Sequence, residues 1–217
     1  VFEVALFDLL ATGVGLGLAG GLEDLDRRGR FALLDGAGMA GLTVARTLRM
    51  AGHEVTVFDK SKGTGGRLSS RSYQGGWIDH GAPYFSAEPG FCDFLRQQLP
   101  AGILQAWRPQ VAGQLRSDEQ SDLIGVPRNS AITRGLLGEL RFQPSTRIAR
   151  LEAGADGWQL YNDGGSRLGD WALVVVAVPA PQALMLVAPS DHVIPDAGAF
   201  QAAVVVADPA IVAGLVG

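Results

Sequence analysis

Apolar and polar residues recur along the chain with two different periods, and the change of period predicts a strand–helix–strand unit. The short apolar run RFALL, residues 30–34, has the length and composition of a buried strand. In MAGLTVARTLRMAG, residues 39–52, leucine and alanine recur at helical spacing and the arginines fall on another face. HEVTVFD, residues 53–59, is typical of a second strand. A helix of this length can return the chain to a parallel strand, so the pattern predicts an α/β fold.

The remaining pattern predicts further strands and two more helices. FCDFLRQQL (91–99) is typical of a short amphipathic helix, and SAITRGLLGELRF (130–142) also has a helical pattern. The stretch between them, 102–127, indicates strands and turns. GWQLYNDGGSRL (157–168) predicts a hairpin with Asp-Gly-Gly as its turn, and ALVVVAVP (172–179) predicts a strand buried on both faces.

Two stretches match the glycine pattern G-x-G-x-x-G, which in a β–α–β unit holds a dinucleotide. The first contains Gly15, Gly17 and Gly20. Only about two helical turns can follow it, and they carry Glu23, Asp24 and Asp26. A carboxylate roughly 7 Å from a phosphate costs about 2 kcal/mol at an effective dielectric constant of 20. The first stretch therefore makes a poor site for a pyrophosphate.

The second stretch has the required context of strand, glycines, helix and strand. The amides and dipole at the start of its helix would face the pyrophosphate. Asp59, which ends the second strand, stands where a carboxylate takes the ribose hydroxyls. Asp35 comes directly before the glycines, at a position that is usually apolar, and the sequence gives no physical reason for it. The predicted pyrophosphate-binding residues are Gly36, Ala37, Gly38, Met39, Ala40 and Gly41.

A basic, glycine-rich loop, KSKGTGGRLSSRS, follows Asp59. It holds both lysines of the chain, Lys60 and Lys62, together with Arg67. A solvated loop is the commoner explanation of such a cluster. Here, however, the loop leaves the carboxyl end of a strand beside the predicted pyrophosphate site, where ligands bind in open α/β sheets. We therefore include Lys60, Gly65, Gly66 and Arg67 among the predicted cofactor-binding residues.

An acid, five residues and then Gly-Gly-Arg (Asp59 to Arg67) resembles the second signature of the flavin-containing amine oxidase superfamily. GGWIDHGAPYFSAE, residues 75–88, is similar to the segment that enters the flavin site in renalase-like FAD-dependent oxidoreductases. The resemblance extends from about Phe31 to Val187, and its two glycine motifs are the specific part. It implies non-covalently bound FAD in a Rossmann-like domain with a parallel sheet, plus a partial inserted α+β substrate segment.

The resemblance also assigns roles to individual residues. It implies that the Gly65-Gly66-Arg67 turn lies along the pyrophosphate and ribityl chain of FAD. It implies that Ile148 touches the adenine through its backbone. It places Ala177 to Pro179, at the end of the apolar strand, close to the cofactor.

The same resemblance suggests how the chain is divided. A discontinuous FAD-binding domain takes residues 31–88 and 142–190, and 89–141 form the inserted substrate-side segment. Residues 1–30 have no counterpart in the family, and 191–217 make an incomplete C-terminal segment. Members of the family close the flavin site with a late apolar strand that ends in Gly-Asp. The only Gly-Asp here, Gly169-Asp170, follows a turn, so we expect part of the flavin pocket to lie outside this sequence.

Composition and charge narrow the classes of partner. The 217 residues are 47% hydrophobic and 18% charged, as in a globular protein. A net charge of −4 argues against a nucleic-acid partner. The apolar opening residues carry two acids and five glycines, so no stable membrane span is expected. The single cysteine, Cys92, excludes an internal disulfide and suits a reducing, cytoplasmic compartment.

Few side chains outside these motifs suggest chemistry. His53, His80 and His192 have no metal-ligand spacing, so no metal is expected. His53 and Cys92 are expected to be structural. His80 and the aromatic pair Tyr84 and Phe85 fall in the segment expected near the flavin ring. A polar loop residue is the commoner explanation of His80, and core aromatics explain Tyr84 and Phe85 equally well. No catalytic residue is assigned.

The sequence thus predicts an FAD-dependent oxidoreductase of the renalase or amine oxidase type with a small-molecule substrate. An amine or a dihydronicotinamide-like donor would pass hydride to the flavin, with O2 as acceptor. Two alternatives stay open: a non-catalytic or degenerate nucleotide-binding relative, and an NAD(H)-binding Rossmann protein. The sequence does not indicate the oligomeric state.

Overall fold

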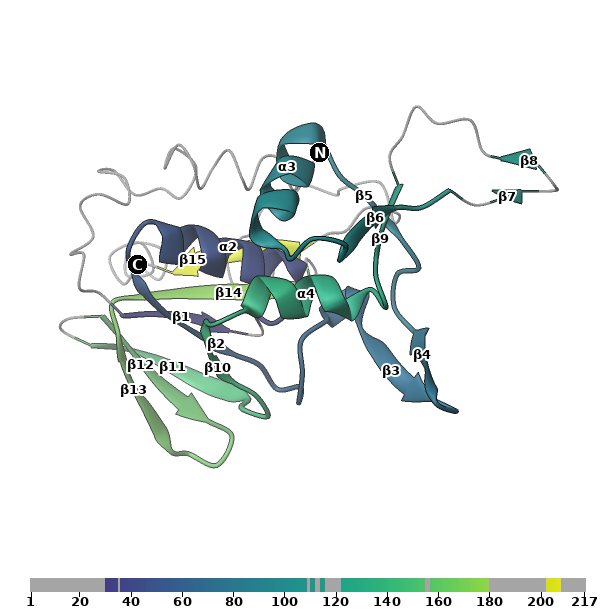
Figure 1. Cartoon of the computed structure of the whole chain (residues 1–217). Coiled ribbons are helices and arrows are strands. Elements are labelled where there is room, and N and C mark those ends of the chain that lie inside the picture. Colours follow the sequence, from purple (N-terminus) through teal and green to yellow (C-terminus); the bar gives the residue numbers. More distant parts are fainter. Residues whose placement is uncertain are drawn as a thin grey trace, which may run out of the picture.

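The computed structural model gives the course of the chain over most of residues 30–207 (Figure 1). The residues that it describes are 30–34, 36–108, 110–111, 114–115, 122–154, 157–179 and 202–207. The first glycine stretch, Asp35 and His192 lie outside these residues. Within them, no helix is long and apolar enough to cross a membrane.

A five-stranded sheet forms the centre of the fold, in the order β10-β2-β1-β14-β15. Four of its strands are parallel to one another, and β15 runs antiparallel to β14. The strand bounds are β1 (Arg30–Leu34), β2 (Glu54–Phe58), β10 (Arg141–Gln143), β14 (Leu173–Pro179) and β15 (Ala202–Ala207). The α/β class and the parallel sheet predicted from the sequence are confirmed.

The first two strands and the helix between them form the predicted β–α–β unit. Helix α2 (Met39–Met50) connects β1 to β2, which pair in parallel with Leu34 opposite Phe58. The helix ends at Ala51, and Gly52 follows with φ +94°, a left-handed conformation that glycine adopts without steric cost. Gly52 is also the last residue of the segment 39–52 in which the sequence predicted a helix.

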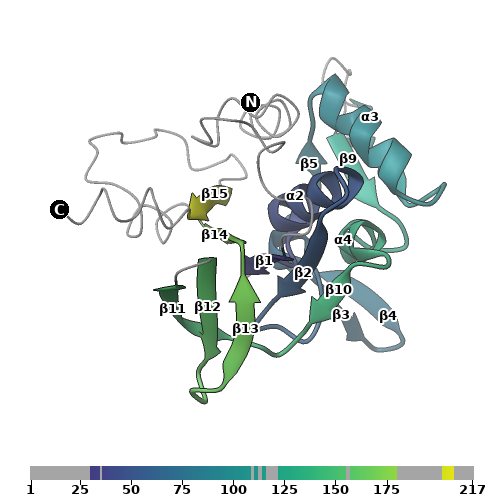
Figure 2. The ribbon, with the colours of Figure 1, turned by 90° about the vertical axis from the view of Figure 1, so that its left-hand side faces the viewer.

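Among the described residues, three helices cover one face of the sheet. Helices α2, α3 (Pro89–Gln98) and α4 (Ser130–Leu137) lie on the same side of it in two views at right angles (Figures 1 and 2). Alternate strand residues, such as Val55 and Val57, enter the core under these helices. Because buried residues from α3 and α4 belong to that same core, segment 89–141 shares its hydrophobic core with the predicted FAD-binding domain.

A three-stranded antiparallel sheet, which we call the meander, covers the other face (Figure 2). Its strands are β11 (Ile148–Gly154), β12 (Gly157–Asn162) and β13 (Arg167–Trp171). The pair β12–β13 is the hairpin that the sequence predicted at 157–168. Strand residues that alternate with the helix-side ones, among them Ala32 and Phe58, pack against the meander in a second core.

Short strands fill the chain between β2 and α4. The 3-10 helix η1 (Gly66–Leu68) leads into a two-stranded hairpin that projects from the main sheet (Figure 1). A small three-stranded sheet has the order β5-β9-β6, and β7 pairs with β8. These strands are β3 (Ser70–Tyr73), β4 (Gly76–Asp79), β5 (Phe85–Ser86), β6 (Leu104–Ala106), β7 (Gln110–Val111), β8 (Gln114–Leu115) and β9 (Asp122–Gly125).

The structure corrects one predicted element. The helix expected over 130–142 ends at Leu137, where Gly138 takes φ +46° and turns the chain. Arg141–Gln143 then form β10, which extends the main sheet by pairing in parallel with β2. Helical periodicity continued past the glycine by chance, and pairing with a distant strand decided the conformation.

His53 is a buried histidine with no part in the predicted site. Its ring packs edge-on against Phe31 with ring centroids 4.4 Å apart, and its Nδ1 atom has no hydrogen-bond partner among the described residues. Burial lowers the pKa of His53 from its usual value, because the charged imidazolium would lose its hydration.

We expect this histidine to make folding stability depend on pH. The unfolded chain binds a proton on His53 near pH 6.5, whereas the folded protein resists protonation until a lower pH. The free energy of unfolding should therefore fall as the pH drops below about 6.5. Urea titrations at several pH values measure this slope. The slope should become shallower in His53→Gln and stay unchanged in His80→Gln, which replaces an exposed histidine. Equal slopes in the two variants and the unaltered protein would contradict this role of His53.

Candidate functional site

The carboxyl ends of three parallel strands meet at one edge of the sheet. Leu34, the last residue of β1, lies opposite Phe58 of β2 on one side and Val176 of β14 on the other. The residues that follow these strands therefore lie together at this edge, which is where open α/β sheets bind ligands. Gly36, Asp59 and Ala177 are all brought to it.

The glycine turn at Gly36 leads directly into α2. The N–H of Gly36 donates to the carbonyl of Phe58 at 3.2 Å, which ties the turn to the end of β2. A Cβ on Gly41 would lie only 2.4 Å from the carbonyl oxygen of Gly36, so only glycine lets the helix pack this closely on the turn. Gly38 begins the helix without a side-chain cap, and the first turn holds no acidic residue. The first amides of α2 are thus suited to an anion.

The Gly-Gly-Arg turn packs directly against this glycine turn. The N–H of Gly65 donates to the carbonyl of Ala37 at 2.8 Å. Gly66 has φ +53°, and a Cβ built on it would lie 3.2 Å from Cα of Gly38. The two glycine motifs therefore form one continuous backbone surface, although Gly41 and Gly65 are 24 residues apart in the sequence.

Asp59 joins the segments that surround this surface. Its Oδ2 atom accepts the N–H of Ala37 at 3.0 Å, and Oδ1 accepts the N–H of Ser61 at 2.8 Å. Its own backbone pairs with Gln143 and Thr146, in the chain that follows α4. Each carboxylate oxygen keeps further acceptor capacity. The predicted role in holding ribose is compatible with this geometry and stays a prediction.

The other predicted binding residues surround the same edge to different degrees. Lys60 and Arg67 are exposed on the loop that follows β2. Ile148 is half-buried at the start of β11, two residues beyond the Thr146 amide that bonds to Asp59. Ala177 is half-buried near the end of β14, and Pro179 is the last residue of that strand.

Asn129, which the sequence analysis did not single out, holds three segments together. Its side-chain oxygen accepts the N–H of Gly125 at 2.7 Å, and its amide nitrogen donates to the carbonyls of Ala82 and Pro83 at 2.9 and 3.0 Å. The residue is 1% exposed. Because Ala82 and Pro83 are more than 40 residues away in the chain, no sequence signal could have identified the contact that Asn129 makes with them.

Asn129 acts on the Gly-Gly-Arg turn through segment 80–83. The N–H of Ala82 donates to the carbonyl of Arg67 at 2.7 Å, so the segment held by Asn129 is bonded to that turn. A second tie comes from α4, where the hydroxyls of Thr133 and Thr64 share a hydrogen bond of 3.1 Å. Helix α4 thus positions the turn through two separate contacts.

The side chains considered for flavin chemistry have mostly structural contacts. The His80 side chain is exposed, and its backbone N–H donates to Ser69 at 3.2 Å. Tyr84 stacks on Trp107 with ring centroids 4.4 Å apart. Phe85 is 3% exposed and belongs to the helix-side core.

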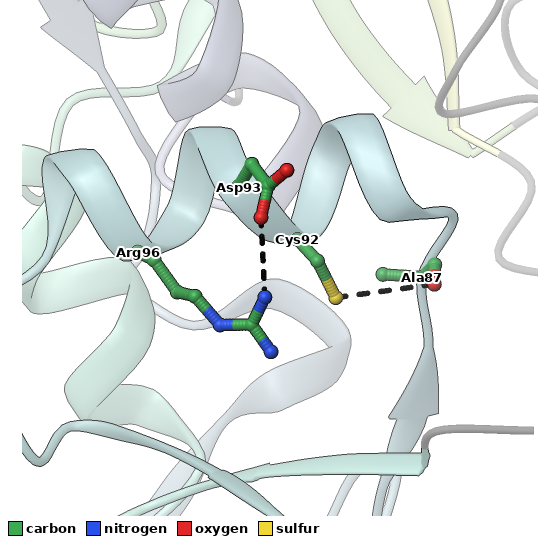
Figure 3. A network of polar contacts seen from close by, with 4 residues as sticks. All are labelled: Ala87, Cys92, Asp93 and Arg96. Carbon is green, nitrogen blue, oxygen red and sulfur yellow. Dashed lines mark hydrogen bonds and ion pairs between the residues drawn. The ribbon is translucent and has the colours of Figure 1, made fainter.

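Cys92 is a packed thiol rather than a reactive one. Its Sγ atom lies 3.9 Å from the carbonyl oxygen of Ala87, to which it donates, while the neighbouring Asp93 and Arg96 pair on the exposed side of α3 (Figure 3). Burial raises the pKa of Cys92; Arg96 acts to lower it and Asp93 to raise it. Among the described residues, no group of three or more His, Cys, Asp or Glu side chains could hold a metal ion.

Comparisons with known proteins agree with this geometry. A family model described as an NAD(P)-binding Rossmann-like domain matches residues 36–97, which include both glycine turns. A CLA-producing fatty acid isomerase from P. acnes has a similar structure, with a TM-score of 0.60 and 11% identity over 74% of this chain and 61% of its own. An oxidoreductase from Methanosarcina mazei has a TM-score of 0.55 and 14% identity over 72% of this chain and 60% of its own.

These likenesses show a Rossmann-like fold. At 11% and 14% identity, they do not transfer a substrate or a reaction. The chain spans about three fifths of the length of either solved structure.

We expect the hydrogen bonds of Asn129 to contribute to the free energy of unfolding. Asn129→Ala leaves the buried N–H of Gly125 without a partner, which should lower the free energy of unfolding by about 1–3 kcal/mol. Chemical denaturation measures this change. As a control, Asn162→Ala removes an exposed hairpin-turn contact to Ser166 and should cost less than 1 kcal/mol, about one ordinary hydrogen bond. Equal losses of unfolding free energy in the two variants would contradict the larger contribution expected of Asn129.

Proposed function

We propose that this protein is an FAD-dependent oxidoreductase with a small-molecule substrate. The observation that carries the proposal is the contact between the two glycine turns, made by the hydrogen bond from Gly65 to Ala37. A pyrophosphate at the start of α2 would then lie against both turns. The Rossmann-like fold and the match over residues 36–97 support a nucleotide at this place.

The residues present fit a diphosphate group. The surface is backbone rather than side chain, because Gly38 and Gly66 leave the space between the turns free of Cβ atoms. Arg67, at the rim, supplies a positive charge that suits phosphate. No acidic side chain occupies the first turn of α2. A diphosphate at the start of α2 would thus meet amides and a cation, while the Asp59 carboxylate is already bonded to the N–H groups of Ala37 and Ser61.

The Gly-Gly-Arg turn is what favours FAD over NAD(H). In the family that the sequence resembles, this turn follows the pyrophosphate and ribityl chain, whereas a simple NAD site needs only the first glycine turn. Asp59 would hold the ribose, Ile148 the adenine through its backbone, and Ala177 to Pro179 would lie beside the cofactor. When bound, FAD would supply the redox chemistry. The chain's own residues would bind and orient it.

We infer an amine or a dihydronicotinamide-like molecule as the reductant and O2 as the acceptor, both from the family resemblance. A second candidate is an NAD(H)-binding protein. It is favoured by the family model, whose description names NAD(P) and whose match covers this surface. A degenerate relative that binds nucleotide without catalysis is the third candidate.

The visible spectrum of the purified protein distinguishes these functions. We expect flavin absorbance that stays with the protein through gel filtration and bleaches under anaerobic conditions when a reduced donor is added. A folded, colourless protein that does not take up added FAD would contradict the proposal. Retention of nicotinamide dinucleotide instead of flavin would favour the NAD(H) alternative.

Substitution of Gly38 tests which glycine stretch binds the cofactor. Gly38 has φ −89°, which any residue can adopt, and a Cβ there would meet only Cα of Gly66, at 3.8 Å. We therefore expect Gly38→Val to fold but to lose at least tenfold in FAD affinity, because its side chain fills the space between the turns. The measurement is FAD binding to apoprotein by flavin fluorescence.

Two matched glycine variants serve as controls. Gly17→Val changes the rival glycine stretch, and Gly90→Val adds a side chain where nothing lies within 4 Å. Both should keep FAD affinity unchanged. If Gly17→Val loses FAD and Gly38→Val retains it, the wrong stretch has been assigned.

A further inference from the structure

A hollow of about 190 Å³ lies on the meander side of the sheet. The meander packs against β1 and β14, and the hollow opens beside it, between β2, β10 and β13. Its apolar walls are Phe58, Leu168 and Trp171. The hollow is much larger than one water molecule, at about 30 Å³, and smaller than the roughly 300–1,000 Å³ of sites for drug-sized ligands. Its size suits a small molecule.

This hollow lies on the other face of the sheet from α2, and at one end it adjoins the predicted nucleotide site, because Gln143 and Thr146 line it and also bond to the backbone of Asp59. The glycine turns lead into α2, which packs on the opposite face of the sheet. The hollow is lined instead by residues of the other face, such as Thr56 and Phe58 of β2. In the parallel register, Arg141 lies opposite Thr56 and Gln143 opposite Phe58, so all four belong to one face.

Two buried polar atoms in the walls of the hollow have no hydrogen-bond partner among the described residues. They are Nε1 of Trp171 and Oγ1 of Thr56. The two residues are 3% and 2% exposed. Buried polar groups are nearly always paired, and leaving one unpaired is costly. An indole N–H can only donate, so the partner that would satisfy Trp171 is an acceptor.

A guanidinium group lies beside the unpaired indole. The Arg30 Cζ atom is 4.5 Å from the centroid of the Trp171 ring. A Cβ built on Gly169 would lie 3.7 Å from both Trp171 Nε1 and Arg30 Nη1. Both donors therefore lie close to the space that a side chain at position 169 would occupy.

The charge of the hollow is positive. Arg30 and Arg141 both line it, and the described residues that line it include no aspartate or glutamate. Glu54 lies nearby and pairs with Arg141 at 3.0 Å, where both side chains are about half exposed. That pair offsets one positive charge at the rim and leaves Arg30 as the cation beside the indole.

We propose that this hollow binds a small organic carboxylate. The carboxylate would accept from the Trp171 indole N–H and the Arg30 guanidinium, whose planar fork matches two carboxylate oxygens. The apolar body of the ligand would contact Phe58 and Leu168. The hydroxyl of Thr56 would donate to the same ligand. This site is proposed in addition to the FAD site, and the contacts that define it, to Arg30, Thr56 and Trp171, involve none of the residues assigned to FAD.

Benzoate is the probe for this site, and Trp171 supplies the signal. In a 1H–15N spectrum of the full-length protein, the indole N–H peak of Trp171 is identified by its loss in Trp171→Phe. We expect benzoate to move this peak saturably, because a carboxylate oxygen would accept from it. Benzamide has the same shape without the charge and should bind at least tenfold more weakly.

Three variants test the contacts. Arg30→Gln should weaken benzoate binding about tenfold or more. Thr56→Val removes only a hydroxyl that has no partner, so it should weaken benzoate binding without lowering the midpoint of thermal unfolding. Arg49→Gln makes the same charge change at an exposed position of α2 and should bind benzoate as the unaltered protein does.

The proposal fails if benzoate produces no saturable shift of the Trp171 peak in protein that is folded by circular dichroism. It also fails if benzamide binds as tightly as benzoate, or if inorganic phosphate moves the peak and benzoate does not. Flavin retention by Arg30→Gln is measured alongside. Loss of benzoate binding with flavin retained assigns the two ligands to separate sites; loss of both would show that the substitution disturbs the shared sheet.

Discussion

The carbonyl of Ala37 accepts a hydrogen bond from the N–H of Gly65, and this contact brings the two glycine motifs together. It requires backbone to approach backbone, because a side chain on Gly66 would press on Gly38. The N–H of Ala37 is bonded to Asp59 at the same time. One residue, Ala37, therefore links the chain after β1, the end of β2 and the loop that carries Arg67. The proposed nucleotide site is the surface of this junction.

Helix α4 and Asn129 keep the junction in place from outside. Asn129 uses its full side-chain amide on backbone groups of β9 and of segment 80–83, and that segment bonds to Arg67. Thr133 reaches the same loop through Thr64. A loop rich in glycine has high conformational entropy, and these contacts offset the cost of ordering it. The segment between β4 and β10 thus supports the nucleotide surface in addition to any role toward substrate.

The two faces of the central sheet are covered in different ways, and this difference separates two possible sites. Helices bury one face in a continuous apolar core. The meander buries the other face only in part, and beside it the hollow is lined by two residues with unpaired buried polar atoms and by two arginines. A ligand that carries hydrogen-bond acceptors would complement these donors. The proposed nucleotide site at the strand ends offers backbone amides, whereas the hollow offers side-chain donors.

The sequence by itself determined the β1–α2–β2 unit and the glycine stretch that opens its helix. Periodicity, the terminating Gly52 and the position of Asp59 are local signals, and short-range physics decides them. It also indicated the β12–β13 hairpin through its turn residues. Only the tertiary structure decided that Arg141–Gln143 form a strand, that Asn129 braces the Gly-Gly-Arg turn, and that Thr56 and Trp171 share a hollow. Each of these depends on hydrogen bonds or packing between residues distant in the chain, for which local pattern carries no information.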